Sequence, residues 1–124
     1  MKDNRPVNLN LFTIKFPLPA ITSILHRISG VALFAGTAIL LYLLQISLES
    51  QAGFDLALEI MNSLLGKILM WLILAALSYH LIAGTKHLLM DIGIGETKGG
   101  AQTGAVVVII GFVISAVLAG VWIW

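Results

Sequence analysis

The segment WLILAALSYHLIAGTKHLLMD, from Trp71 to Asp91, decides the fold of this chain. It has the character of an apolar helix that can cross a bilayer, with one histidine, His80, set well inside it. Gly84, His87 and Asp91 follow His80 at i+4, i+7 and i+11, which is one face of a helix with 3.6 residues per turn. The segment therefore predicts a spanning helix that carries a polar stripe.

The stripe presents an imidazole, a gap without a side chain at Gly84, a second imidazole and a carboxylate. An ionisable side chain at membrane depth indicates a functional site, because hydrocarbon offers it no water. A flat ligand can lie against Gly84 while His80 reaches it, which is a haem-like geometry. One ring nitrogen would then bind iron while a hydrogen bond holds the other. The alternative is that His80 bonds a neighbouring carbonyl or hydroxyl and only holds helices together.

The composition places the chain in a membrane. It has 124 residues, of which 59% are hydrophobic and 10% charged, and a mean hydropathy of +1.02. Soluble domains carry about 25% charged residues. The net charge of +1 without a basic cluster excludes a nucleic-acid partner. Because there is no cysteine, the chain itself has no disulfide, iron–sulfur ligand or thiolate.

We expect an all-α integral membrane bundle of three transmembrane helices, at about residues 23–48, 60–90 and 103–124. About 20 apolar residues span a hydrocarbon core ~30 Å thick. The second and third helices are joined by the polar, glycine-rich loop GIGETKGGAQTG, which is typical of a turn outside the bilayer.

The first 22 residues are expected to form an amino-terminal arm, followed by a transmembrane anchor domain at residues 23–124. Three prolines block a continuous helix in the arm: Pro6, Pro17 and Pro19. The arm is expected to lie in the cytoplasm, along the membrane surface or a partner.

The basic residues predict the orientation. Six of the seven lie on the amino-terminal side or near the loop before the third helix: Lys2, Arg5, Lys15, Arg27, Lys86 and Lys98. The opposite side, residues 49–67, has three acidic residues and one lysine. The positive-inside rule therefore puts the amino terminus in the cytoplasm and the carboxyl terminus on the far side. His80 then lies in the cytoplasmic half, about 9 Å deeper than Lys86.

A second stripe lies at the start of the first helix, at Ser23, His26, Arg27, Gly30 and Phe34. One interpretation is a helix start, with a serine cap and interfacial side chains that reach the headgroups. The other is a binding face, in which His26 and Arg27 meet anionic groups such as haem propionates and Ser23 bonds a carbonyl oxygen. Both stripes lie at the same membrane depth.

The sequence supplies only one histidine at the depth of His80, since His26 and His87 are expected nearer the interface. A six-coordinate haem would therefore take its second ligand from another chain. Asp91 is expected to pair with Lys86 or His87 at the surface, with a quinone or proton-relay role as the alternative.

Three segments resemble one family: RPVNLNL at Arg5–Leu11, SILHRISG at Ser23–Gly30 and HLIAGTKHLLMDIG at His80–Gly93. They are similar to the cytochrome b membrane-anchor subunit of bacterial succinate dehydrogenase, the succinate:ubiquinone oxidoreductase of respiratory complex II. The resemblance covers about three-quarters of the chain. It depends on the paired patterns S-x-x-H-R and H-x-x-x-G-x-x-H-x-x-x-D.

The resemblance implies haem b shared with a second hydrophobic anchor subunit that donates the other axial histidine. His80 matches the haem-iron ligand, His26 and Arg27 match positions near the propionates, and Ser23 and Arg27 match the ubiquinone pocket. One position departs from the family, which usually has arginine where this chain has Lys86. A lysine keeps the charge but loses the bidentate fork.

The resemblance also implies an iron–sulfur subunit and a flavoprotein subunit on the cytoplasmic face of a bacterial inner membrane, with the carboxyl terminus periplasmic. Electrons from succinate, in the tricarboxylic acid cycle, would pass to ubiquinone, and no residue of this chain would oxidise succinate. Two alternatives stay open: the anchor of a fumarate reductase, and a haem-free structural anchor.

Overall fold

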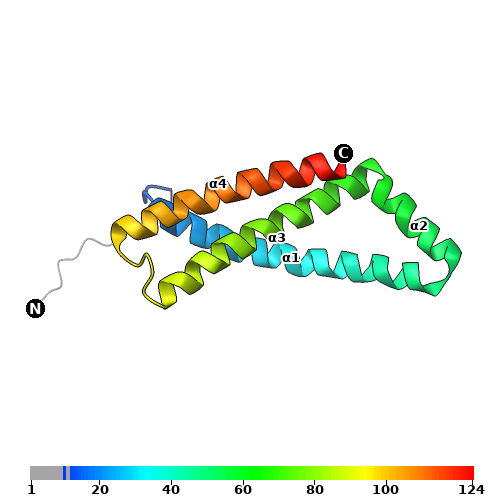
Figure 1. Ribbon diagram of the computed structural model, residues 1–124, viewed down its shortest axis with the longest axis horizontal. Coiled ribbons are helices and arrows are strands. Elements are labelled where there is room, and N and C mark those ends of the chain that lie inside the picture. Colours follow the sequence, from blue (N-terminus) through cyan, green and yellow to red (C-terminus); the bar gives the residue numbers. More distant parts are fainter. Residues whose placement is uncertain (1–9, 11) are drawn as a thin grey trace, which may run out of the picture.

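The computed structural model describes Asn10 and residues 12–124, and the described part contains four helices and no strand. They are α1 (Leu18–Glu49), α2 (Gln51–Asn62), α3 (Leu64–Asp91) and α4 (Lys98–Ile123). Three of them, α1, α3 and α4, are long and apolar enough to cross a membrane. The start of α1, the end of α3 and the start of α4 lie at one end of the bundle, and α2 closes the other (Figure 1). The predicted all-α membrane bundle with three spans is confirmed.

The first helix begins earlier than predicted, because two of the three prolines start it instead of blocking it. Pro17 is its N-cap residue, with an extended ψ of 151°, and Pro19 occupies the first turn. Proline is tolerated there because the first-turn amides have no partner within the helix. Pro6, Lys2 and Arg5 lie outside the described residues, as do the other masked positions of the predicted arm, residues 1–9 and 11.

The predicted helix 60–90 is divided at Ser63, and a separate short helix, α2, precedes the break. The Ser63 Oγ accepts from the Gly66 amide at 3.0 Å and caps α3. Ser50 caps α2 in the same way, through the Gly53 amide at 3.0 Å. Hydropathy alone cannot detect these breaks, because apolar residues continue across Ser63.

The loop before the last helix is shorter than predicted. Thr97 accepts from the Gly100 amide at 3.1 Å, so α4 begins at Lys98 and takes up the second half of the glycine-rich stretch. The chain reverses at Gly93 and Gly95, whose φ values of 86° and 75° lie in the region that glycine adopts without strain.

Helix α3 packs between α1 and α4 through small residues. A Cβ on Gly36 of α1 would lie 3.0 Å from Ile73 Cγ1, and a Cβ on Gly111 of α4 would lie 3.3 Å from Ile82 Cδ1. Such close approach is typical of helix packing in lipid. The indole of Trp71 also donates to the Ala116 carbonyl at 2.9 Å, which joins α3 to α4 directly.

Most of the apolar surface is not covered by the chain itself. In the most apolar windows of α1, α3 and α4, only 6%, 17% and 11% of the residues are buried. A soluble protein does not expose that much contiguous apolar surface. The chain is therefore a multi-pass membrane protein whose outer surface faces lipid or other subunits.

Candidate functional site

Three histidines meet where α1 and α3 cross. The rings of His26 and His80 are stacked, with centroids 4.1 Å apart and planes at 19°. His87 lies on the other side of His26, at 5.3 Å and 56°. Packing of α1 against α3 brings the two rings into contact, although His26 lies over Gly84, one helical turn nearer the end of α3 than His80.

A reciprocal pair of contacts makes this crossing possible. His80 lies over Gly30 of α1, where a Cβ would be 3.1 Å from its Cε1, and His26 lies over Gly84 of α3, where a Cβ would be 3.2 Å from its Nε2. Each glycine stands four residues after the histidine of its own helix, and the two helices run in opposite directions (Figure 1). The gap predicted at Gly84 exists, and the imidazole of His26 fills it.

Ser29 orients His80. Its Oγ donates to the His26 carbonyl at 2.7 Å and lies 3.0 Å from His80 Nδ1, which is also 3.2 Å from that carbonyl. The only hydroxyl hydrogen of Ser29 is already used, so the neutral imidazole donates from Nδ1. The Nε2 atom is left with a lone pair, and it makes no hydrogen bond to any described residue.

Sequence reasoning missed Ser29, which lies off the stripe of Ser23 and His26. The signal that could have found Ser29 is a seven-residue spacing along α1. The buried residues of α1 are seven apart, at Thr22, Ser29, Gly36 and Leu43. A seven-residue repeat is the seam of two helices that wrap around each other, and two of its members here are polar.

Tyr79 is a second residue that sequence reasoning missed. Its hydroxyl donates to the Thr22 carbonyl at 2.8 Å, and its ring meets Phe112 of α4 edge-on at 5.3 Å. This buried side chain therefore ties the start of α1 to α3, one residue before His80. A buried tyrosine hydroxyl needs a hydrogen-bond partner within the protein, and the Thr22 carbonyl is that partner here.

Ser23 and Arg27 lie one helical turn apart beside His26. Ser23 is half-buried and Arg27 is exposed. Neither side chain makes a hydrogen bond or ion pair with the residues that the structure describes. Both are therefore available to a ligand or a partner. They lie in the first three turns of α1, and α1 starts at the end of the bundle where α3 terminates (Figure 1).

The remaining predicted residues do not join the cluster. Lys86 packs against α4, where a Cβ on Gly104 would lie 3.3 Å from its Cε. Asp91 is exposed as the last residue of α3, and no ion pair joins it to Lys86 or His87 in the described part of the chain.

The ring nitrogens of His80 and His26 differ in what they could bind. No group of three or more histidine, cysteine or acidic side chains in the described residues is arranged to hold a metal ion. His80 has what an axial ligand needs, a bonded Nδ1 and a free Nε2. The Nε2 of His26, in contrast, is buried, has no hydrogen-bond partner among the described residues and faces the backbone of Gly84.

Comparison with known proteins identifies related chains. Residues 1–118 match the model of the succinate dehydrogenase/fumarate reductase transmembrane subunit family. The succinate dehydrogenase cytochrome b556 subunit of Coxiella burnetii is 41% identical over 125 residues, covering 100% of both chains. The subunit of the same name in Paracoccus denitrificans is 38% identical and covers 94% of this chain and 90% of its own. The mitochondrial succinate dehydrogenase cytochrome b560 subunit of Sus scrofa is 36% identical, and the match covers 92% of this chain and 69% of its own.

Proposed function

The chain belongs to the succinate dehydrogenase/fumarate reductase transmembrane subunit family, and from this we propose that it binds haem b against a second anchor subunit and forms part of a ubiquinone site. The chain is a membrane subunit of an enzyme complex. Its relatives named in the comparison are cytochrome b subunits of succinate dehydrogenase. Those names favour succinate oxidation over fumarate reduction as the activity of the complex.

The observation that carries the proposal is the hydrogen bonding of His80. Its Nδ1 is held by Ser29 Oγ at 3.0 Å, and its Nε2 has no partner within the described residues. A metal-binding histidine donates its other ring N–H to an oxygen, which fixes the ring and raises the basicity of the ligand. Haem b, when bound, supplies a one-electron carrier.

The second axial ligand is expected from the partner subunit. Two histidines of this chain that held one haem would need room for the haem between their rings. His26 and His80 are stacked face to face at 4.1 Å, which leaves no space for a haem between the rings. His26 is therefore assigned to the surroundings of the haem, near a propionate. The hydrophobic partner would cover part of the exposed apolar surface of α1 and α3.

Arg27 and Ser23 are assigned to the ubiquinone site. Ubiquinone presents two carbonyl oxygens, which accept hydrogen bonds. The Ser23 hydroxyl would donate to one of them, and the Arg27 guanidinium would stabilise negative charge on the reduced ring. Arg27 also has the planar fork that suits a haem propionate. Electrons would come from succinate through a flavoprotein and an iron–sulfur subunit, since no described side chain suggests succinate chemistry here.

The proposed orientation puts this end of the bundle on the cytoplasmic side of a bacterial inner membrane. Arg27 lies in the first three turns of α1, Lys86 in the last turns of α3 and Lys98 at the start of α4. These helix ends meet at this end of the bundle (Figure 1). The positive-inside rule supports a cytoplasmic location for it, with the carboxyl terminus in the periplasm. The catalytic subunits would then dock where Ser23 and Arg27 are available.

A difference spectrum of the purified complex, reduced with dithionite minus oxidised, tests the haem assignment. We expect a b-type band that is lost or shifted in His80→Ala, while His87→Ala keeps it. A complex without any b-type band would leave only the haem-free structural anchor. A band unchanged by His80→Ala would mean that another residue is the ligand.

The quinone assignment is tested by turnover. Ser23→Ala and Arg27→Leu should slow quinone reduction while succinate-to-dye activity is retained, because the dye accepts electrons before the membrane site. Ser47→Ala, at the opposite end of α1, is the matched control. Quinone reduction at the unmodified rate in both variants would put the quinone site elsewhere.

A further inference from the structure

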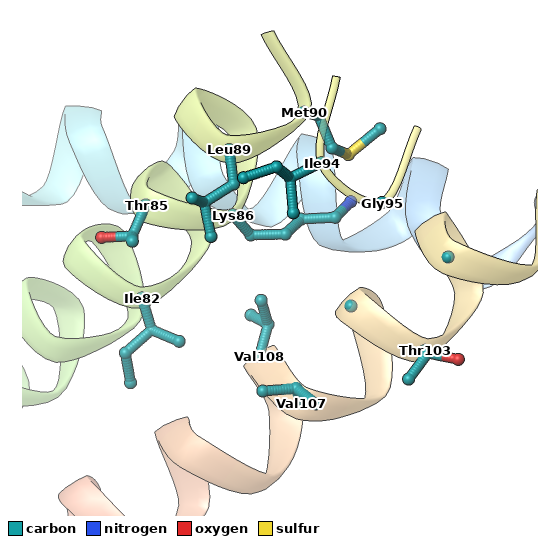
Figure 2. A pocket seen from close by; sticks show the side chains of 12 residues that line it. Ile82, Thr85, Lys86, Leu89, Met90, Ile94, Gly95, Thr103, Val107 and Val108 are labelled. Carbon is teal, nitrogen blue, oxygen red and sulfur yellow. The ribbon is translucent and has the colours of Figure 1, made fainter. Parts of the chain in front are cut away.

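A cavity of about 410 Å³ opens between the last turns of α3, the first turns of α4 and the loop that joins them (Figure 2). It lies on the α4 side of α3, whereas the histidines lie on the α1 side. Its volume is within the range of about 300–1,000 Å³ that is typical of ligand sites. Nothing in the proposed haem and quinone sites uses it.

The walls of the cavity are apolar and open toward the bilayer. Ile82 and Leu89 line it from α3, and Val107 lines it from α4. Leu89 is 41% exposed and Val107 is 58% exposed, so the cavity is open along the flank of the bundle. Both helices are membrane spans. The cavity is therefore open at membrane depth, on a flank of the bundle that this chain itself does not cover.

One charged side chain lines this apolar cavity, that of Lys86. Its methylene stem lies over Gly104, whose Cβ, if present, would be 3.3 Å from Cε and 3.4 Å from Cγ. The side chain extends toward the loop that carries Ile94 and Gly95 (Figure 2). Within the part of the chain that the structure describes, its ammonium group makes no ion pair, and no carboxylate lines the cavity.

This combination matches the shape of an anionic phospholipid. A lysine near the end of a spanning helix buries its stem and holds its charge at headgroup depth. An anionic headgroup at that depth would pair with the ammonium group of Lys86. The acyl chain of the same lipid would pack along Ile82 and Val107. A neutral quinone or a zwitterionic lipid would leave the cation without a net opposite charge. Anionic lipids are attracted to basic residues at the membrane surface.

We propose that this cavity binds one anionic phospholipid, with its phosphate on Lys86 and an acyl chain between α3 and α4. The site needs a glycine at position 104, because a side chain there would crowd the methylene stem of Lys86 where it lies against α4. The site is independent of the haem and quinone assignments, since its residues face away from the histidines.

Native mass spectrometry of the purified, intact complex tests the charge. The complex is titrated with phosphatidylglycerol and, separately, with phosphatidylcholine of the same chains. We expect one saturable phosphatidylglycerol site per chain that Lys86→Gln weakens about tenfold, the size of one charge-assisted contact. Lys98→Gln is the matched control, since this exposed lysine lies at the same end of the bundle but outside the cavity. Equal binding of the two lipids, or equal affinity of the Lys86 and Lys98 variants, would overturn the proposal.

Two neighbouring valines test the acyl groove without changing charge. Both Val106 and Val107 are exposed, but only Val107 lines the cavity. Val107→Phe should lower phosphatidylglycerol binding severalfold, whereas Val106→Phe should not. Soluble glycerol phosphate should fail to compete, because it has no acyl chain. Competition by glycerol phosphate would show a free-phosphate site instead. A photo-crosslinker at position 107 that captures another subunit would show that protein fills the groove, and either result would overturn the proposal.

Discussion

The imidazole of His26 lies directly over Gly84, so close that a Cβ on the glycine would be 3.2 Å from Nε2. The same contact recurs with the roles of the helices exchanged, between His80 and Gly30 at 3.1 Å. Each histidine therefore fits against the opposite helix because a glycine, which has no side chain, lies beneath it. The Ser29 hydroxyl, 3.0 Å from Nδ1, then helps to fix the rotation of the His80 ring.

A side chain at position 84 should disrupt the crossing. Gly84→Val would force His26 away from α3, and overpacking of this kind costs about 1–3 kcal/mol. We expect a lower thermal midpoint of the purified complex and a changed difference spectrum. Gly99→Val is the control, because a Cβ there meets nothing within 4 Å. Identical midpoints for the two variants would show that the close contact does not constrain the helices.

Removal of the Ser29 hydroxyl should alter the environment of His80. Ser29→Ala leaves Nδ1 with only the His26 carbonyl at 3.2 Å, and the lost hydrogen bond is worth about 0.5–1.5 kcal/mol. The hydrogen-bond partner of a metal-binding histidine tunes the properties of the bound metal. We therefore expect a shifted redox midpoint of the b-type band, restored by Ser29→Thr.

Thr37→Ala is the matched control for Ser29, since the Thr37 hydroxyl bonds only the Leu33 carbonyl of its own helix. An unchanged midpoint in Ser29→Ala would remove Ser29 from any orienting role. A shift of the same size in both variants would indicate a general effect on α1.

Loss of the Tyr79 hydroxyl should loosen the start of α1. Tyr79→Phe removes the 2.8 Å bond to the Thr22 carbonyl but keeps the ring against Phe112. We expect about 0.5–1.5 kcal/mol of destabilisation, measured as a lower thermal midpoint. Tyr42→Phe should have no effect, because Tyr42 is 61% exposed and its hydroxyl has no partner among the described residues. A larger loss in Tyr42→Phe would contradict the assignment.

The absence of native cysteine makes the orientation easy to measure. A single cysteine in place of Glu96, in the loop before α4, should react with a membrane-impermeant maleimide only from the cytoplasmic side. A cysteine in place of Gln51, at the start of α2, should react only from the periplasmic side. The reverse pattern would show that the positive-inside prediction is wrong for this chain.

Sequence periodicity predicted the spans and the face of α3 that carries His80 and His87, because both depend on one helix at a time. It did not predict that His26 would stack on His80, since that contact depends on the register between two helices. Ser29 was missed for the same reason. The resemblance related Lys86 only to the arginine of the family, whereas its position on α3 turns it toward Gly104. The helix boundaries failed where single hydroxyl groups, those of Ser63 and Thr97, decide them.

The stacked histidines also order events during biosynthesis. Nδ1 of His80 and the carbonyl of His26 that it approaches are 54 positions apart, on the first and second membrane spans. The imidazole pair cannot form while the ribosome has delivered only the first span to the bilayer. Nor does His80 acquire its Ser29 contact until α3 has inserted and docked. Any cofactor that needs this oriented ring must therefore be loaded after insertion of the second span.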